Sequence, residues 1–315
     1  MNPLSGFVPY DSIVTLTDRT LRHLRDVADL PDLTGTRYEM VAPVGRGGMG
    51  AVYVVQDLAL GRAVAMKVQS GAIDESSTTR LEAEARVLAS LEHPGIVPVH
   101  DVGVLPDGRV FYVMKLVQGD RLDRLASTVG TLAERVRLIV RAVDAVAFSH
   151  AHGIVHRDLT PGNIMVGAFG EVLVLDWGLA VTVGGNASSQ SVAGTPGFMA
   201  PEQSHGVADT RSDVYALGAL LDWWVAPAQG GPVRLPRTLR AVIDKARSPR
   251  PDDRYADAAE LSVDLLRYLD GAPVTAYRET WLDRTVRFGR RYRIAILLVL
   301  GYLIMRVALL LLRGI

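Results

Sequence analysis

The sequence contains no cysteine, which excludes disulfide bonds and cysteine-ligated metal centres. It also lacks an excess of either charge, because 34 Lys and Arg residues balance 34 Asp and Glu residues. Without an overall basic character, no nucleic acid is expected among the partners. The first twenty residues contain no basic stretch followed by an apolar run, so no signal peptide is expected there.

The composition is that of a folded chain. Of its 315 residues, 49% are hydrophobic and 22% are charged, enough for one large two-lobed domain or two ordinary ones. The first 36 residues form an extension in which apolar residues at helical spacing predict a helix over 17–30. Two interpretations stay open for it: a short helix packed on the main domain, or a regulatory arm that binds a partner.

The stretch 155–163, followed by Asp176, carries the clearest chemistry. Asp158, Asn163 and Asp176 lie on loops between short apolar runs, a pattern that predicts strand–turn–strand segments. Carboxylate and amide oxygens are the ligands that Mg²⁺ prefers, and a further carboxylate nearby can accept a proton from a hydroxyl. These residue types together indicate phosphoryl transfer.

A glycine-rich stretch, GRGGMG at 45–50, follows a predicted strand at 38–44. In a dinucleotide-binding turn this pattern leads into a helix. Here it leads into the β-branched run 51–55, so we expect a strand, a glycine loop and a second strand. A hairpin of this kind can place its backbone N–H groups on phosphate oxygens.

Lys67 lies in an alternating apolar strand predicted at 62–68. A buried lysine is unfavourable without an anionic partner, which here is a phosphate or a carboxylate of the helix predicted at 76–91. Glu84 is the preferred carboxylate and Glu82 the alternative, and an ordinary solvated salt bridge is the plainer interpretation. Further along, strands are predicted at 97–104 and 109–117, a buried helix at 131–152 and a closing helix at 261–269.

These motifs, taken in order, resemble those of bacterial, eukaryotic-like (Hanks-type) serine/threonine protein kinases. The resemblance runs from about Tyr38 to Asp270. It rests on GRGGMGAV (45–52), VAMK (64–67), Glu84, HRDLTPGN (156–163), DWG (176–178), GTPGFMAPE (194–202), SDVYALG (212–218) and RPDDRY (250–255).

The resemblance implies an α+β, two-lobed protein-kinase fold with a small β-rich lobe containing one helix and a larger, mainly helical lobe. The kinase domain would cover 37–271, with the small lobe at 37–117 and the large lobe at 118–271. The implied activity is transfer of the ATP γ-phosphate to Ser and Thr hydroxyls of proteins. The implied cofactors are ATP and Mg²⁺ or Mn²⁺, and the partners are protein substrates and a second copy during autophosphorylation.

Site residues follow from the resemblance by position. Asp158 matches the catalytic base and Arg157 the arginine that contacts a phosphorylated activation loop, while Asn163 and Asp176 match metal ligands. The positions that match the nucleotide site are Gly45, Arg46, Gly47, Gly48, Met49, Gly50, Val52, Ala65, Lys67, Glu84, Met114, Leu116 and Met165. Structural matches are the apolar column Leu88, Val99, His156 and Trp177, the ion pair Glu202–Arg254, and an activation loop with hydroxyls at Thr182, Ser188, Ser189, Ser191 and Thr195.

The chain departs from the family pattern at three places. Thr160 stands where the family has a lysine that supports the γ-phosphate, so transfer could be slower or substrate choice altered. Trp177 replaces a phenylalanine, and the segment after Gly218 is short, with Trp223 and Trp224 either in the core or in a docking surface. A pseudokinase or membrane-tethered scaffold is therefore the alternative to an active protein kinase. A small-molecule kinase is a third possibility, which GTPGFMAPE argues against because it resembles a peptide-binding loop.

The carboxy-terminal end is the most apolar part of the chain. After a basic connector at 272–293, residues 294–312 are long enough as a helix, at about 28 Å, to span a bilayer core of ~30 Å. The arginines before it predict a single-pass anchor in the inner (cytoplasmic) membrane, in contact with lipid and with the kinase domain in the cytoplasm. Arg306 interrupts the apolar run, so a helix in the membrane interface or buried against protein is the alternative.

Overall fold

The structure is a computed structural model that describes residues 30–47, 50–69, 75–125, 130–182, 194–226, 235–281, 285 and 292–313. The helix predicted at 17–30, apart from Leu30, lies outside these ranges, as do Gly48 and Met49, three activation-loop serines, and 282–284 and 286–291 of the basic connector. The chain divides into two compact units. The first comprises Met1–Ala83 and Val99–Leu116, and the second comprises Glu84–Pro98 and Val117–Ile315.

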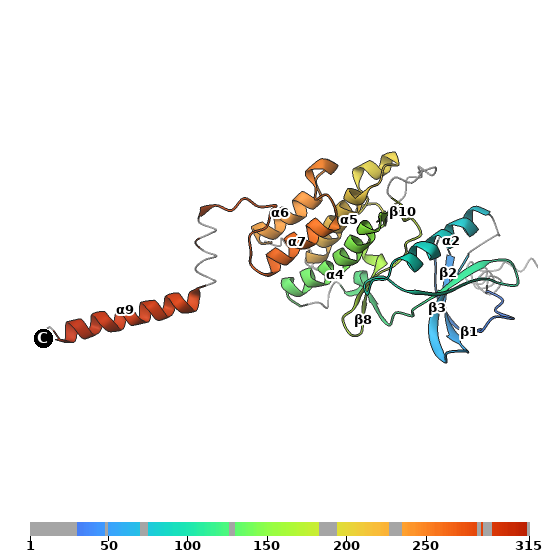
Figure 1. Ribbon diagram of the computed structural model, residues 1–315, viewed down its shortest axis with the longest axis horizontal. Helices are drawn as coiled ribbons and strands as arrows, with labels where there is room; N and C mark the ends of the chain where they lie inside the picture. Colours follow the sequence, from blue (N-terminus) through green and yellow to red (C-terminus); the bar gives the residue numbers. More distant parts are fainter. Residues whose placement is uncertain are drawn as a thin grey trace, which may run out of the picture. The chain divides into compact units, whose positions relative to one another are not determined.

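The first unit is built on a five-stranded antiparallel sheet (Figure 1). The strand order is β1-β2-β3-β5-β4. The core between the strands contains fully buried Val55, Val64, Met66 and Val113, because alternate β-branched and long apolar residues face one side of the sheet. The strands are β1 Tyr38–Gly47, β2 Gly50–Asp57, β3 Arg62–Val68, β4 Val99–Val104 and β5 Val110–Met114.

Two of these strands are shorter than the sequence predicts. β4 begins at Val99 rather than residue 97, since Pro98 has no backbone N–H to donate to a sheet. Val99 pairs with Met114, so the chain after Met114 has no residue of β4 opposite it and β5 ends there rather than at 117. Helix α2 (Glu75–Ser90) confirms the helix predicted at 76–91 within one residue at each end.

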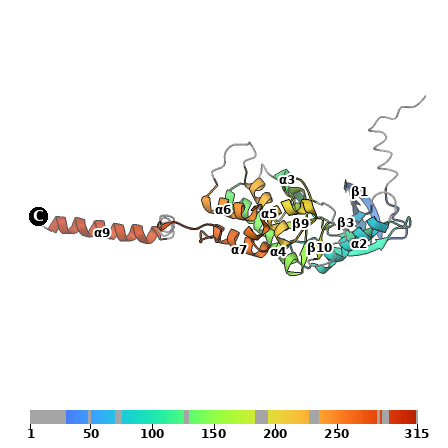
Figure 2. The ribbon, with the colours of Figure 1, turned by 90° about the horizontal axis from the view of Figure 1, so that it is seen from above.

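The second unit is mainly helical. Helix α4 (Leu132–Ala151) packs against α7 (Ala258–Leu269) and α5 (Thr210–Val225), as Figures 1 and 2 both show, and α6 (Arg237–Ala246) packs on α5. A capping box starts α4, in which the Thr131 hydroxyl accepts from the Glu134 N–H and the Glu134 carboxylate accepts from the Thr131 N–H. The predicted long buried helix is thereby confirmed.

Short strands hold the loops that carry the chemistry. β7 (Ile154–Val155) pairs with β10 (Val181–Thr182), and β8 (Ile164–Gly167) pairs with β6 (Gly119–Arg121) and β9 (Val172–Val174). The predicted strand–turn–strand arrangement around 155–176 is therefore confirmed. The remaining short elements are α3 (Leu122–Leu125) and the 3₁₀ turns η1 (Pro161–Asn163), η2 (Pro201–His205) and η3 (Pro251–Asp253).

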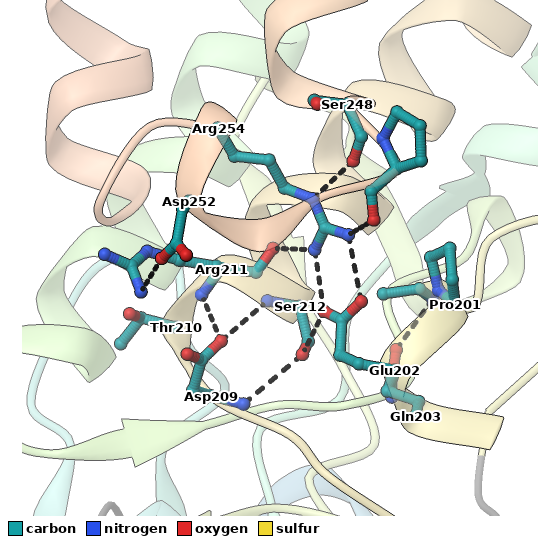
Figure 3. A network of polar contacts seen from close by, with 12 residues as sticks. Pro201, Glu202, Gln203, Asp209, Thr210, Arg211, Ser212, Ser248, Asp252 and Arg254 are labelled. Atoms are coloured by element: carbon teal, nitrogen blue, oxygen red, sulfur yellow. Dashed lines mark hydrogen bonds and ion pairs between the residues drawn. The ribbon is translucent and has the colours of Figure 1, made fainter. Parts of the chain in front are cut away.

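A polar network joins η2, the start of α5 and the segment around η3 (Figure 3). The Arg254 guanidinium, whose side chain is 0% exposed, lies 2.6 Å from Glu202 Oε1 and also donates to the Ser248 and Arg211 carbonyls. Ser212 Oγ donates to the same carboxylate oxygen. The predicted structural ion pair Glu202–Arg254 is confirmed.

The two tryptophans of α5 have different environments. Trp224 is buried at 1% exposure, and its indole N–H donates to the Arg135 carbonyl on α4. Trp223 stacks on it and is 38% exposed. The interpretation of this pair as core residues is therefore confirmed for Trp224 only.

Helix α9 (Arg293–Arg313) exposes a series of apolar side chains, including Ile294, Leu297, Leu298 and Ile304. In α9 the structure describes side chains only as far as Leu309. Among the described residues, no helix is both long enough and apolar enough to cross a membrane. The structure therefore does not support the spanning helix predicted at 294–312.

Candidate active site

The glycine-rich stretch forms the turn of the β1–β2 hairpin in the first unit. Gly45 lies opposite Val52, Arg46 opposite Ala51 and Gly47 opposite Gly50. The interpretation as strand, glycine loop and strand is confirmed, because a strand and not a helix follows the glycines. At Gly50 a Cβ atom would lie 2.7 Å from the Val68 carbonyl oxygen on β3, so glycine lets the two strands approach. Gly48 and Met49 lie outside the described ranges.

Lys67 lies on β3 with its side chain buried, at 7% exposure. It faces Val52 across the β2–β3 pair, and its ammonium group lies 5.9 Å from the centre of the Tyr112 ring, within cation–π range. Two residues earlier on β3, Ala65 lies opposite Met114 on β5. The sheet therefore collects four of the predicted nucleotide-site residues on three adjacent strands, and Leu116 follows β5 directly.

The carboxylate predicted as the partner of Lys67 lies on α2. Glu84 is buried at 3% exposure, whereas Glu82 is only half-buried, so burial favours Glu84 as the carboxylate that needs a cationic partner. The pairing of Lys67 with Glu84 joins residues of the two units, and it stays a prediction.

In the second unit, Asp158 is held by three neighbours. The Asn163 side-chain N–H donates to the Asp158 carbonyl at 2.9 Å, Thr195 Oγ1 donates to Asp158 Oδ1 at 2.8 Å, and the Asp158 N–H donates to His156 Nδ1 at 3.3 Å. A carboxylate fixed in this way can orient a hydroxyl and accept its proton. Thr195 brings the end of the activation loop to that carboxylate.

Asp176 lies close to Asn163 through the backbone. The Leu175 N–H donates to the Asn163 carbonyl at 2.8 Å, and the Leu175 carbonyl accepts from His156 Nε2 at 3.0 Å. The Trp177 ring packs on the His156 ring with centroids 4.6 Å apart, which confirms that contact of the predicted apolar column. Met165, on β8, follows the Asn163 turn directly.

These residues fit a hard divalent cation. The Asn163 amide nitrogen is engaged with Asp158, which leaves the amide oxygen for a ligand, and Asp176 supplies a carboxylate. Within the described part of the chain no group of three or more His, Cys, Asp or Glu side chains could hold a metal. A donor set of one carboxylate and one amide suits Mg²⁺, which keeps water ligands and binds substrate phosphates.

The backbone at Arg157 adopts a left-handed conformation, with φ at 73°, as does Asp176 at 59°. Such conformations are unfavourable for residues with a Cβ, by about 1–3 kcal/mol, and persist only where neighbours hold them. Asp213, which is 0% exposed and lies at the start of α5, holds the backbone at Arg157. Its carboxylate accepts from the His156 N–H at 2.7 Å and from the Arg157 N–H at 2.8 Å.

Burial alone would raise the pKa of the Asp213 carboxyl, but the hydrogen bonds from the His150 side chain and the His156 backbone N–H lower the pKa below its usual value. The Ala258 N–H donates to His150 Nδ1, so His150 Nε2 carries the proton that it shares with Asp213. His150 therefore has a structural role, since it connects α4, α5 and the start of α7.

Thr160, which stands where the family has lysine, lies just before η1 and is 9% exposed. Its side chain makes no capping hydrogen bond to that turn.

Sequence reasoning missed two residues of this site. Asp213 lies in SDVYALG, which served only as a family marker, although an acidic residue inside an apolar helix is a signal of a buried anchor. Gln203 follows Glu202 in η2 and contacts the catalytic loop, and no local pattern indicates that contact.

The protein kinase domain family matches residues 38–226. The chain belongs to this family. It is 39% identical over 276 residues to the serine/threonine-protein kinase PknB of Mycolicibacterium smegmatis. The matched region covers 76% of this chain and 44% of the relative. It is 44% identical over 201 residues to the DNA damage-responsive serine/threonine-protein kinase RqkA of Deinococcus radiodurans. In this case the matched region covers 60% of this chain and 30% of the relative.

A third relative is PknB of Mycobacterium tuberculosis, 37% identical over 281 residues and covering 78% of this chain and 45% of the relative. The chain thus spans less than half the length of these curated relatives. Membership confirms the predicted bacterial Hanks-type kinase resemblance and the fold with a β-sheet unit and a helical unit. Kinases of this family use ATP and a divalent metal.

Proposed function

We propose that this chain is an ATP-dependent protein kinase that transfers the γ-phosphoryl group to Ser and Thr hydroxyls of proteins. The observation that carries the proposal is the arrangement around Asp158. Thr195 and Asn163 donate to its carboxylate, Asn163 also donates to its backbone carbonyl, and the Leu175 N–H beside Asp176 donates to the Asn163 carbonyl. The three relatives described above are serine/threonine kinases by name, which supports the same activity.

The chain's own residues would divide the work in the following way. Asp158 orients the substrate hydroxyl and accepts its proton as the hydroxyl oxygen bonds to the γ-phosphorus, while the bond from that phosphorus to the β–γ bridging oxygen breaks and ADP leaves. Asn163 and Asp176 hold Mg²⁺, which supplies charge neutralisation of the phosphates when it is bound. Lys67 holds the nucleotide phosphates by its charge, and the Gly45–Gly50 hairpin does so through backbone N–H groups.

The test is transfer of radiolabelled phosphate from Mg²⁺-ATP by the full chain, purified in mild detergent, to a generic protein substrate. Asp158→Asn keeps the size of the side chain and removes the proton acceptor, so we expect a loss of roughly 10²–10⁴-fold. Asp176→Ala should abolish transfer, because it removes a metal ligand. Asp123→Asn, the same chemical change at an exposed residue of α3, should leave transfer unchanged.

One observation favours a second function, a nucleotide-binding scaffold with little transfer. Thr160 places an uncharged, buried side chain where the family has a lysine. A wild-type chain that binds ATP in a thermal-shift assay but transfers no label would establish the scaffold. Label on Ser and Thr that Asp158→Asn loses would exclude it.

We also propose that the chain phosphorylates its own activation loop, in a transient complex of two copies. Thr195 already donates a hydrogen bond to Asp158, and further hydroxyls precede it in the sequence. Mass spectrometry after incubation with ATP should locate phosphate within 178–195. A rate that does not depend on protein concentration would contradict the complex of two copies.

For its location, we propose that α9 attaches the chain to the cytoplasmic membrane as a single-pass anchor, with the kinase domain in the cytoplasm. The support is the apolar sequence of 294–312, the exposed side chains of α9 and the arginines that precede it. After cell lysis the full chain should stay with membranes through carbonate extraction, and a chain ending at 293 should be released. Release of the full chain by carbonate would indicate binding at the membrane surface, and its recovery in the soluble fraction would contradict attachment.

A further inference from the structure

We propose that Gln203 is a positioning residue for the catalytic loop: its side chain holds the backbone of Arg157 in the conformation that presents Asp158. The inference deepens the proposed kinase activity and rests on it. Gln203 directly follows Glu202, one of the residues of the network in Figure 3, and its side chain is 1% exposed.

The amide of Gln203 uses both of its ends. Nε2 donates to the Arg157 carbonyl at 2.9 Å, and Oε1 accepts from the Ala200 N–H at 2.9 Å. Ala200 is fully buried, so its N–H needs an acceptor inside the protein. One side chain thus connects the end of the activation segment to the catalytic loop.

The contact falls on a strained residue. Arg157 has φ at 73°, and Asp213 Oδ1 accepts from its N–H while Gln203 donates to its carbonyl. The two peptide groups that flank the unfavourable φ are therefore each held by a buried side chain. Loss of either hydrogen bond lets the peptide rotate, and the next residue is Asp158, whose carboxylate must lie within hydrogen-bond reach of the substrate hydroxyl.

Gln203 acts on the catalytic loop through a backbone atom, the Arg157 carbonyl. Its side-chain amide bonds to backbone atoms of Arg157 and Ala200, whereas the side chains of Asn163, Thr195 and His156 contact Asp158 itself. Its effect on transfer therefore passes through the position of the loop rather than through substrate contact.

Two variants separate the donor from the acceptor. Gln203→Glu keeps an oxygen for the Ala200 N–H but replaces the donor to Arg157 with a second acceptor. Gln203→Met keeps the length of the side chain and removes both. Ser204→Ala, in the same 3₁₀ turn but exposed, is the matched control.

In the full chain we expect Gln203→Glu to lower kcat on the order of 10-fold to 100-fold, because small displacements of a positioned group have effects of that size. KM for ATP should stay within about twofold of the wild-type value, since the contact does not involve the nucleotide.

The Gln203→Glu variant should also respond to pH. A buried Glu that faces a carbonyl oxygen has a raised pKa, and its protonated form can donate a hydrogen bond to that oxygen again. The ratio of the Gln203→Glu rate to the wild-type rate should therefore rise as the pH falls from 8 to 6. The charged groups around this site, Asp213, His150, His156, Arg157 and Glu202, are present in both chains, so a change of the ratio with pH reports the carboxyl group introduced at 203 in that setting.

Hydrogen exchange gives a readout that does not require transfer. In Gln203→Glu, peptides that contain the amides of Arg157 and Asp158 should exchange faster than in the wild type and in Ser204→Ala, while α4 stays protected. The exchange measurement tests the role of Gln203 even if the wild type transfers no phosphate. Absence of transfer by the wild type would contradict the proposed function and not the positioning role of Gln203.

Three results would overturn the inference. The first is unchanged exchange at 157–158 in Gln203→Glu. The second is a fall in kcat that matches only a lowered fraction of folded protein, with no pH-dependent recovery. The third is failure of both variants to give a cooperative unfolding transition, which would make Gln203 a residue required for folding rather than for positioning.

Discussion

Single residues decide the shape of the catalytic loop. Arg157 and Asp176 both adopt left-handed conformations, and the buried carboxylate of Asp213 accepts the N–H groups of His156 and Arg157. The loop is therefore held through its backbone, from a helix that begins more than fifty residues later in the chain. The side chains that carry the chemistry can then face outward.

Asp213 gives a prediction about acid stability. Its pKa is lowered in the folded protein, so its contribution to the free energy of unfolding is present above the unfolded-state pKa of about 3.9 and is lost as the pH falls through the folded-state value. Asp213→Asn should be less stable than the wild type by about 1–3 kcal/mol at pH 7, since one buried donor loses its acceptor. Urea midpoints at pH 3–7 should show the difference between the two chains shrinking below pH 4. A constant difference would contradict this assignment.

Thr160 gives a prediction about rate. Thr160→Lys places a cation where negative charge develops on the transferred phosphoryl group, so we expect kcat to rise about 10-fold, equivalent to ~1.4 kcal/mol. Thr160→Met is the control, because it adds length without charge. Steady-state transfer assays check both variants, and equal rates for lysine and methionine would show that charge at this position is irrelevant.

At the scale of elements, periodicity predicts most helices and strands, and the errors have local causes. Pro98 shortens β4, and the loss of a pairing partner then shortens β5. The hairpin at the glycine loop follows from the β-branched run after it, which no dinucleotide-binding turn would contain. Helix α4 follows from its apolar stripe and its capping box.

The contact between α5 and α6 gives a prediction about packing. A Cβ atom on Gly218 would lie 2.7 Å from Ala246 Cβ and 2.9 Å from Arg247 Cγ, so the helices approach only because residue 218 is glycine. Gly218→Ala should lower the free energy of unfolding by about 1–3 kcal/mol through overpacking.

Ala246→Gly supplies the control for this contact. It removes the methyl group that Gly218→Ala would meet, so the double variant should be more stable than the sum of the two single losses predicts. Urea unfolding of the four chains measures this coupling, and additive losses would show that the clash is relieved elsewhere.

At the scale of the whole molecule, the chain has two compact units, and the second includes the exposed apolar helix α9. Long-range polar contacts stabilise the second unit. Burial alone would raise the pKa of the Glu202 carboxyl, but the hydrogen bonds from Arg254 and Ser212 lower this pKa below its usual value. Glu202 is therefore charged in its ion pair with the buried Arg254 guanidinium. Asp264, 1% exposed on α7, likewise accepts from Tyr255 and from the N–H groups of Thr275 and Ala276, which fixes the chain where it leaves the kinase fold.

The network of Figure 3 gives a prediction about global stability. Glu202→Gln leaves the fully buried Arg254 without its counter-charge, and we expect a loss of roughly 3–5 kcal/mol. Asp252→Asn is the control, because it breaks the exposed ion pair with Arg211 and should cost about 0–1 kcal/mol. Urea unfolding monitored by tryptophan fluorescence measures both, and equal losses would mean that burial does not set the strength of these pairs.

The sequence by itself determined the family, the order of the elements and the residue types of the site. Each motif is local: a glycine turn followed by a β-branched run, a lysine in an apolar strand, or carboxylates between short strands can be recognised without knowing what lies beside it. Only the tertiary structure decided which distant groups hold the catalytic loop. Asp213 and Gln203 reach Arg157 across 56 and 46 positions of the chain. No local pattern encodes such contacts, because they arise from the packing of helices that are far apart in the sequence.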